Sequence, residues 1–215
     1  MRGSFTSTPE PPMNRIRTSE NDPIAVDFLP SEWVELPGKI GMTFAPGKQH
    51  QGMHFCWRRN LQKDLDRLGE AYRTDILISL IEAPELERVH IPDLMPEVRA
   101  RGIESWWFPI PDLKVPTSME GLLDLVEKIL GAVRDGETVV IHCMGGLGRT
   151  GVVASCCLVA LGCDPEDAIA QVRRVRQYTV ETREQENYVV QFSRAWMKRH
   201  TLISLDSRLS QKRYG

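Results

Sequence analysis

The chain has 215 residues, 41% of them hydrophobic, which is enough to build one folded domain. It carries 27 Lys and Arg against 29 Asp and Glu, so a net charge of −2 excludes bulk attraction to nucleic acid or to an acidic membrane. No segment approaches the roughly 20 apolar residues that cross a bilayer. The first residues lack an apolar signal core, and five cysteines cannot all pair. We therefore expect a cytoplasmic protein.

The N-terminal part of the chain gives only weak structural signals. Residues 1–22 are polar and rich in proline without a hydrophobic period, which predicts a flexible tail. Short strands are expected over residues 24–29 and 33–36, as a hairpin or as edge strands. Proline and glycine pairs at residues 37–38 and 46–47 mark turns.

From residue 60 the pattern alternates between helix and strand periods. Helices are expected over residues 60–72, 85–101, 119–133, 151–161, 165–176 and 184–199, and strands over residues 75–81, 104–108 and 138–143. This order predicts the α/β class, with a central, mostly parallel, twisted sheet flanked by helices. We expect a single catalytic domain over residues 23–200, followed by a tail over residues 201–215.

The most informative segment begins where the strand over residues 138–143 ends. His142 and Cys143 are followed by Met144, Gly145, Gly146, Leu147, Gly148, Arg149 and Thr150, and an apolar helix comes next. Five residues between a cysteine and an arginine can wrap a loop whose N–H groups bind an anion at a helix N-terminus. Glycines allow this close backbone approach, and a guanidinium can bind two phosphate oxygens at once.

The same surroundings favour the thiolate form of a cysteine, which is the nucleophilic form. Attack by Cys143 on a phosphate ester would form a phosphocysteine that water then hydrolyses, and Thr150 is expected to donate a hydrogen bond to the departing sulfur. The alternative is that Cys143 is only a small core residue. The complete order of strand, cysteine, loop, arginine, hydroxyl residue and helix favours the catalytic interpretation. His142 should point away from the nucleophile and support the loop.

The leaving oxygen of a phosphate ester needs a proton from a second loop. Asp112 follows a predicted strand and two prolines that stiffen its loop, so it is the candidate acid for the first step and base for the second. A Pro-Asp pair is also ordinary turn chemistry, but the position before the Cys143 strand favours the catalytic role.

The loop from Cys143 to Arg149 resembles the signature of the kinase-associated phosphatases, the cyclin-dependent kinase inhibitor 3 type. The segment from Arg58 to Asp64 is similar to an Arg-Arg-Asn-x-Gln-Lys-Asp stretch of that family, and residues 45–48 are similar to its upstream Pro-Gly turn. The similarity covers roughly residues 24–200. It implies a dual-specificity phosphatase fold that acts on phosphotyrosine, phosphoserine or phosphothreonine, with a protein kinase as one partner.

Two positions refine what this resemblance implies. The acid segment Ile110 to Lys114 contains a proline and a lysine where the family has Ile-Ala-Asp-Gly-Gly, so the acid loop should be stiffer and more basic here. Gln185 matches a late glutamine of the family that helps to orient the phosphate or the hydrolytic water; the other interpretation is a solvated helix residue.

We also predict the substrate class and the ligands. The loop residues 144–148 are uncharged, which disfavours a highly anionic lipid headgroup and favours a phosphorylated protein or peptide. His50, His54 and Cys56 lack a fourth ligand at zinc-like spacing, so neither a metal nor another cofactor is expected. Arginines at positions 173, 174 and 176 form either a basic rim for a phosphorylated partner or a solvated helix end. A module that binds phosphoproteins or docks a kinase without turnover is the alternative function.

Overall fold

The computed structural model describes residues 15–213, and the side chains of residues 15–201. The main sheet has the strand order β2 (Asp27–Phe28), β3 (Lys39–Phe44), β8 (Thr138–Cys143), β6 (Ile76–Ser79) and β7 (Glu104–Trp107). Neighbouring strands are parallel except for β2 and β3, which are antiparallel. The predicted α/β class is confirmed, with a sheet that is mixed at one edge.

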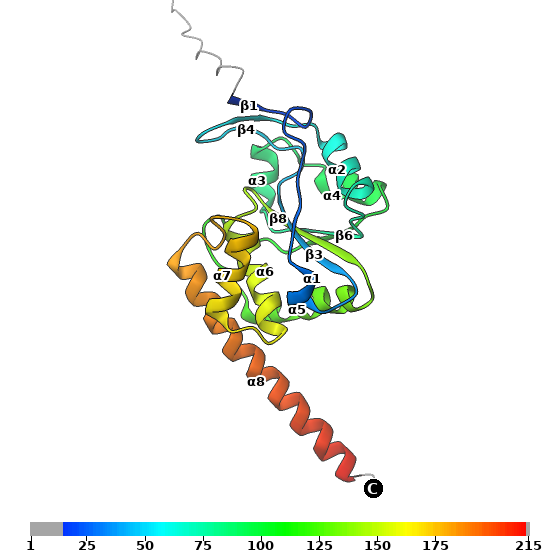
Figure 1. The fold of residues 1–215 in the computed structure, drawn as a ribbon, viewed down its shortest axis with the longest axis vertical. Helices are drawn as coiled ribbons and strands as arrows, with labels where there is room; N and C mark the ends of the chain where they lie inside the picture. The colour runs from blue at the N-terminus through cyan, green and yellow to red at the C-terminus, as the bar shows by residue number, and fades with distance from the viewer. Residues whose placement is uncertain (1–14, 214–215) are drawn as a thin grey trace, which may run out of the picture.

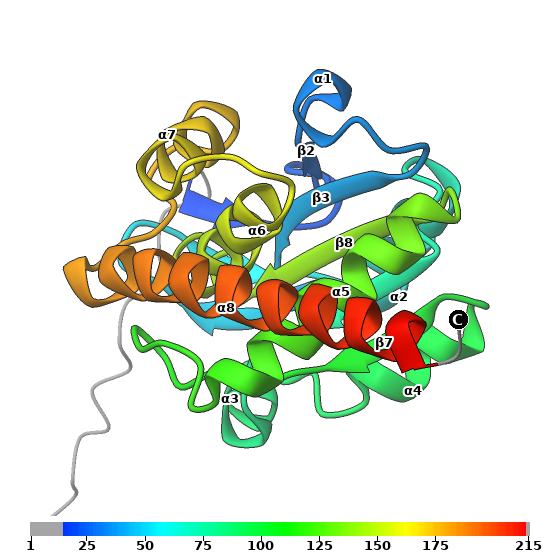
Figure 2. The ribbon, with the colours of Figure 1, turned by 90° about the horizontal axis from the view of Figure 1, so that it is seen from below.

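Helices cover both faces of this sheet (Figure 1). One face carries α5 (Met119–Arg134), α6 (Gly148–Ala160), α7 (Pro165–Val175) and the first part of α8 (Arg183–Arg213), and the other carries α2 (Leu61–Glu70) and α4 (Leu94–Ala100). Figure 2 shows α8 crossing this first helical layer next to α5 and α6, against which it packs. No helix within residues 15–213 is long and apolar enough to cross a membrane.

The central strand β8 carries the predicted nucleophile to one edge of the sheet. All six of its residues are buried, as expected for a strand covered on both faces. In the register of the sheet, Cys143 lies beside Phe44 of β3 and His142 lies beside Ser79 of β6. The carboxyl ends of three parallel strands therefore meet at Cys143, where open α/β sheets bind their ligands.

The prediction for residues 24–44 was wrong in two places. Residues 33–36 are not a strand: a single turn of helix, α1 (Ser31–Val34), occupies this region and ends at Glu35 in the left-handed conformation with φ 51°. The strand lies later, as β3, and it is an interior strand of the sheet. Gly41 in the middle of β3 weakens the strand pattern in the sequence, because glycine is uncommon in strand interiors. Glycine is needed at this position because a Cβ there would lie 2.4 Å from Val26 Cγ1.

The single helix predicted over residues 85–101 is two helices, α3 (Ala83–Arg88) and α4. Pro92 lies between them. A proline in a helix interior removes a backbone donor and clashes with the preceding turn, so one continuous helix is excluded. The break frees α3 to approach the carboxyl end of the sheet.

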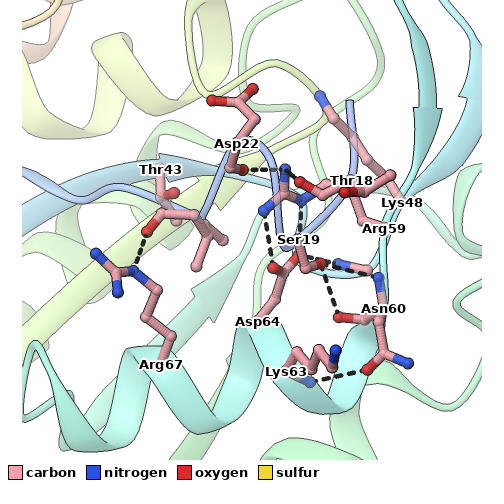
Figure 3. A network of polar contacts seen from close by, with 12 residues as sticks. Thr18, Ser19, Asp22, Thr43, Lys48, Arg59, Asn60, Lys63, Asp64 and Arg67 are labelled. Carbon is pink, nitrogen blue, oxygen red and sulfur yellow. Dashed lines mark hydrogen bonds and ion pairs between the residues drawn. The ribbon is translucent and has the colours of Figure 1, made fainter. Parts of the chain in front are cut away.

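The predicted flexible tail over residues 1–22 is too long. Residues 1–14 lie outside the described part, but β1 (Ile16–Arg17) pairs with β5 (Cys56–Arg58), which also pairs with β4 (Gln49–Gln51). Residues 18–22 are then held by the Arg59 guanidinium, which donates to the carbonyl oxygens of Asp22 at 2.7 Å and Thr18 at 3.4 Å (Figure 3). The polar segment is ordered because buried side chains bind its backbone.

The predicted tail over residues 201–215 was also not a separate segment. The backbone of α8 continues without a break to Arg213, and residues 214–215 lie outside the described part. This end of α8 projects from the rest of the molecule (Figure 1).

Candidate active site

The loop between β8 and α6 has the form expected of an anion cradle. Gly146 has φ +70°, and a Cβ at this position would lie 2.2 Å from the Thr43 carbonyl oxygen, so only glycine fits. Cys143 is 3% exposed. Helix α6 begins at Gly148, three residues earlier than predicted, and its N-cap residue Leu147 makes no side-chain capping hydrogen bond. The cysteine therefore lies beneath the N-terminus of a buried helix.

Two cations hold the carbonyl groups of this loop outward. Lys48 Nζ donates to the Met144 carbonyl oxygen at 3.0 Å, and Arg176 donates to the carbonyl oxygens of Gly146 at 2.7 Å and Gly145 at 3.1 Å. In a trans peptide the N–H of the next residue points the opposite way. The N–H groups of Gly145, Gly146 and Leu147 consequently face the other side of the loop, and in residues 15–213 no acceptor binds them.

Arg149 is buried in the first turn of α6 and is held by three groups. Its guanidinium donates to both carboxylate oxygens of Glu85, at 2.6 and 2.9 Å, and to the carbonyl oxygen of Ile110 at 2.9 Å. It also donates to Asp112 Oδ1 at 2.9 Å. The guanidinium lies within range of electrostatic attraction to Cys143. The structure thus brings Asp112, from a separate loop, to Arg149 at the end of the loop that follows Cys143.

Glu85 is a site residue that the sequence analysis missed. Its side chain is 5% exposed, and burial is the largest single influence and opposes its ionisation, but the hydrogen bonds from Arg149 and the Glu82 backbone together with the charges of Arg149 and Arg88 hold the pKa of Glu85 below its usual range. The carboxylate also accepts from the Glu82 backbone N–H, closing a capping box at α3. The capping pattern was visible in the sequence, but it indicates only a helix start.

Asp112 lies on an exposed loop that two contacts restrain. The Asp112 side chain is 54% exposed and also accepts from the backbone N–H of Leu113, which has φ 58°. On the same loop, the Lys114 carbonyl oxygen accepts a hydrogen bond from Gln185 Nε2 at 3.1 Å. The loop therefore places its carboxylate at the cradle while its far side is attached to the start of α8.

Gln185 is fully buried and does not lie on a solvated face. Its Oε1 accepts from the backbone N–H of Glu181 at 2.9 Å, and Glu181 Oε2 accepts from the Gly148 N–H at 2.8 Å. Glu181 is a second residue that the sequence analysis missed. A Cβ at Gly148 would lie 2.4 Å from Glu181 Oε2, so this glycine permits the close approach. Gln185 links the acid loop to the segment that contacts the cradle.

His142 and Thr150 lie behind the nucleophile and are both buried. His142 Nε2 lies 2.7 Å from Ser79 Oγ and Nδ1 lies 3.3 Å from the Cys143 carbonyl oxygen. A carbonyl oxygen only accepts, so Nδ1 carries the proton and Nε2 accepts from Ser79. Burial lowers the pKa of His142 to about 4, so the imidazole is neutral at pH 7. Thr150 Oγ1 has no hydrogen-bond partner among the described residues.

The arginines at the C-terminal end of α7 do not form a free basic rim. Arg173 binds the carbonyl oxygens of Thr179 and Val180 and the Glu186 carboxylate, and Arg176 binds the loop carbonyls and Asp27. Arg174 lies over the Trp33 ring. The rim interpretation is therefore wrong for Arg173 and Arg176, because their donors are occupied within the fold.

Comparison with known proteins agrees with this geometry. The family model described as "Cyclin-dependent kinase inhibitor 3" matches residues 2–170. Cyclin-dependent kinase inhibitor 3 of Homo sapiens is 30% identical over 191 residues, which cover 87% of this chain and 85% of that protein. The protein of the same name from Rattus norvegicus has the same identity and coverage.

One solved structure extends this likeness to the whole fold. A crystal structure of kinase-associated phosphatase, with its catalytic-site cysteine replaced by serine, superposes with a TM-score of 0.74 at 26% identity, over 81% of this chain and 96% of that one. We conclude that the chain belongs to the cyclin-dependent kinase inhibitor 3 family of dual-specificity phosphatases, which hydrolyse phosphoric monoesters.

Proposed function

We propose that this protein dephosphorylates protein side chains in two steps, with Cys143 as the nucleophile. The observation that carries the proposal is that Asp112 binds Arg149 at the loop that follows Cys143, and that the N–H groups of loop residues 145–147 have no acceptor among the described residues. A phosphate group in this cradle would accept hydrogen bonds from the loop N–H groups and from the Arg149 guanidinium.

In the first step the Cys143 sulfur attacks phosphorus while the bond to the leaving oxygen breaks, and Asp112 donates its proton to that oxygen. In the second step water attacks the phosphocysteine, Asp112 accepts a proton from the water, and the S–P bond breaks to return the thiolate and inorganic phosphate. Thr150, whose hydroxyl has no partner among the described residues, is the proposed hydrogen-bond donor to the departing sulfur.

Arg149 has to change partners during this cycle. In the structure, one Nη2 hydrogen bond goes to Asp112, while Glu85 accepts from both terminal nitrogens. We expect the phosphate to replace Asp112 on Arg149 and Glu85 to keep the guanidinium plane in position. The Asp112 carboxyl group is then free to meet the leaving oxygen.

We propose phosphorylated proteins as the substrates, including phosphotyrosine and phosphoserine or phosphothreonine. The loop residues 144–148 have no charged side chain to bind a highly anionic lipid headgroup. The relatives named as inhibitors of a cyclin-dependent kinase and as a kinase-associated phosphatase make a protein kinase the partner to test first. A cytoplasmic location suits a reactive cysteine, which needs a reducing compartment.

The test compares turnover with substrate trapping on a panel of phosphopeptides that includes a kinase activation loop. Cys143→Ser should abolish turnover and retain phosphopeptide binding. Asp112→Asn should lower turnover by about 10²- to 10⁴-fold, most for substrates with poor leaving groups. A wild-type protein that binds the peptides without releasing phosphate would instead establish a non-catalytic binding module. Activity on phosphoinositides alone would contradict a protein substrate.

A further inference from the structure

Lys48 is a buried cation next to the candidate nucleophile. It follows β3, whose last residue lies beside Cys143, and the residue is only 4% exposed. Its Nζ donates to the Met144 carbonyl oxygen at 3.0 Å and lies 3.9 Å from the centre of the Trp57 ring. Among the described residues no carboxylate lies within 4.0 Å of this amine. Lys48 is thus a buried ammonium without an ordinary counter-ion.

An unpaired buried ammonium is unfavourable, so either a nearby anion stabilises its charge or its pKa falls. Burial is the main cause that lowers the pKa of Lys48, to about 7. Cys143 and Asp22 act to raise its pKa, and the cations Arg59 and Arg176 act to lower it; His50 also faces it. Of the two groups that act to raise the pKa of Lys48, Cys143 has the stronger effect.

The backbone around Lys48 is fixed by a buried ion pair. Arg59 donates to both oxygens of Asp64, at 2.7 and 2.8 Å, and Asp64 Oδ2 accepts from the Gly47 N–H at 2.8 Å. The Lys48 carbonyl oxygen accepts from the Arg59 N–H. Figure 3 shows Lys48 beside this pair. The amine is therefore held in place by its surroundings and is not free to reach solvent.

We propose that Lys48 is a positioning residue for the phosphatase reaction, which holds the Met144 carbonyl outward and supplies positive charge to the Cys143 thiolate. This inference rests on the proposed function. The outward Met144 carbonyl directs the Gly145 N–H into the cradle, because the two belong to one peptide unit. The ammonium charge favours both the thiolate and the bound phosphate over their neutral forms.

The first experiment replaces the charge and keeps the volume. Lys48→Met should slow alkylation of Cys143 by iodoacetate at pH 6 about tenfold, measured by mass spectrometry of the Cys143 peptide. Its kcat for an aryl phosphate should fall by a similar factor. Lys48→Arg, which keeps a positive charge, should restore part of the alkylation rate and part of kcat. Lys128→Met is the matched control, because this exposed amine lies 3.6 Å from the centre of the Trp106 ring and loses the same charge. Alkylation and kcat of Lys48→Met equal to the wild type would overturn the proposal.

A second experiment does not depend on the folding of a Lys48 variant. The Lys48 ammonium is titrated by NMR of ¹³C- and ¹⁵N-labelled lysine in the wild type and in Cys143→Ser. Loss of the thiolate should lower the titration midpoint of Lys48, because coupling between two charges acts equally on both. An unchanged midpoint would exclude the charge coupling. An inactive wild-type protein would refute the proposed function, whereas an active enzyme that is insensitive to Lys48 would refute only this inference.

Discussion

At the scale of single residues, the site combines groups that must stay charged with one that must stay neutral. Arg149 keeps its charge through Glu85, whereas His142 is buried among neutral partners and is uncharged at pH 7. His142 acts as a fixed link between β6 and β8.

His142 predicts a pH dependence of stability. Its pKa of about 4 in the folded protein lies below the value of about 6.5 expected for an unfolded chain. Between these values the unfolded chain binds the proton and the folded protein does not, so stability is complete above about pH 6.5 and falls as the pH drops towards 4, by about 3 kcal/mol. Urea unfolding should show this slope in the wild type.

The contribution of His142 can be isolated by substitution. His142→Asn should flatten the slope of unfolding free energy between pH 4 and 6.5. His90→Asn is the control, because His90 is exposed and its φ of 59° is a conformation that asparagine tolerates. An equal slope in wild type and His142→Asn would show that other groups cause the pH dependence.

At the scale of elements, the position of Asp112 depends on a loop, and α8 restrains this loop from outside. Gln185, at the start of α8, makes both contacts of this restraint. Its Nε2 donates to the Lys114 carbonyl oxygen, and its Oε1 accepts from the Glu181 backbone N–H. Its amide donates on one side and accepts on the other, so neither a carboxylate nor a hydrophobic side chain of the same size can replace it.

Gln185→Ala should therefore affect the acid step more than substrate binding. We expect kcat to fall about tenfold to hundredfold for substrates with poor leaving groups and much less for p-nitrophenyl phosphate, with little change in KM. Gln177→Ala, at an exposed position on the preceding loop, is the control. A uniform loss for all leaving groups would indicate a role in binding phosphate or water and would contradict the loop-restraint interpretation.

At the scale of the whole molecule, one buried ion pair contacts both the N-terminal segment and the backbone next to the candidate active site. The Arg59–Asp64 pair is fully buried and contacts residues 18–22 on one side and Gly47, next to Lys48, on the other. A change in this pair should therefore affect both global stability and the cradle.

Arg59→Met should lower the free energy of unfolding by about 3–5 kcal/mol, because it leaves the Asp64 carboxylate buried and unpaired. The double variant Arg59→Met with Asp64→Leu should recover part of this loss. Lys63→Ala is the control, since its pair with Glu20 is exposed and should contribute far less than the buried pair. Urea unfolding measures all three. A loss for Arg59→Met as small as that for Lys63→Ala would contradict the role of the buried pair.

The sequence by itself determined the α/β class and the order of most helices and strands after residue 60, because their hydrophobic periods are long and regular. It also identified Cys143, Arg149 and Asp112 as candidates, since the spacing of a loop between a strand and a helix is a local property. The resemblance in residues 58–64 pointed to the correct family for the same reason.

Only the tertiary structure showed that Glu85, Lys48 and Glu181 lie at the site and that β3 is an interior strand of the sheet, next to β8. Each of these depends on contacts between segments far apart in the chain: Glu85 is 64 residues from Arg149, and Lys48 is 96 residues from Met144. Hydrophobic periodicity and motif spacing depend only on residues that are close together in the sequence. Which buried charge meets which partner is decided by packing, because an ion is stable inside a protein only where the whole fold supplies its counter-charge.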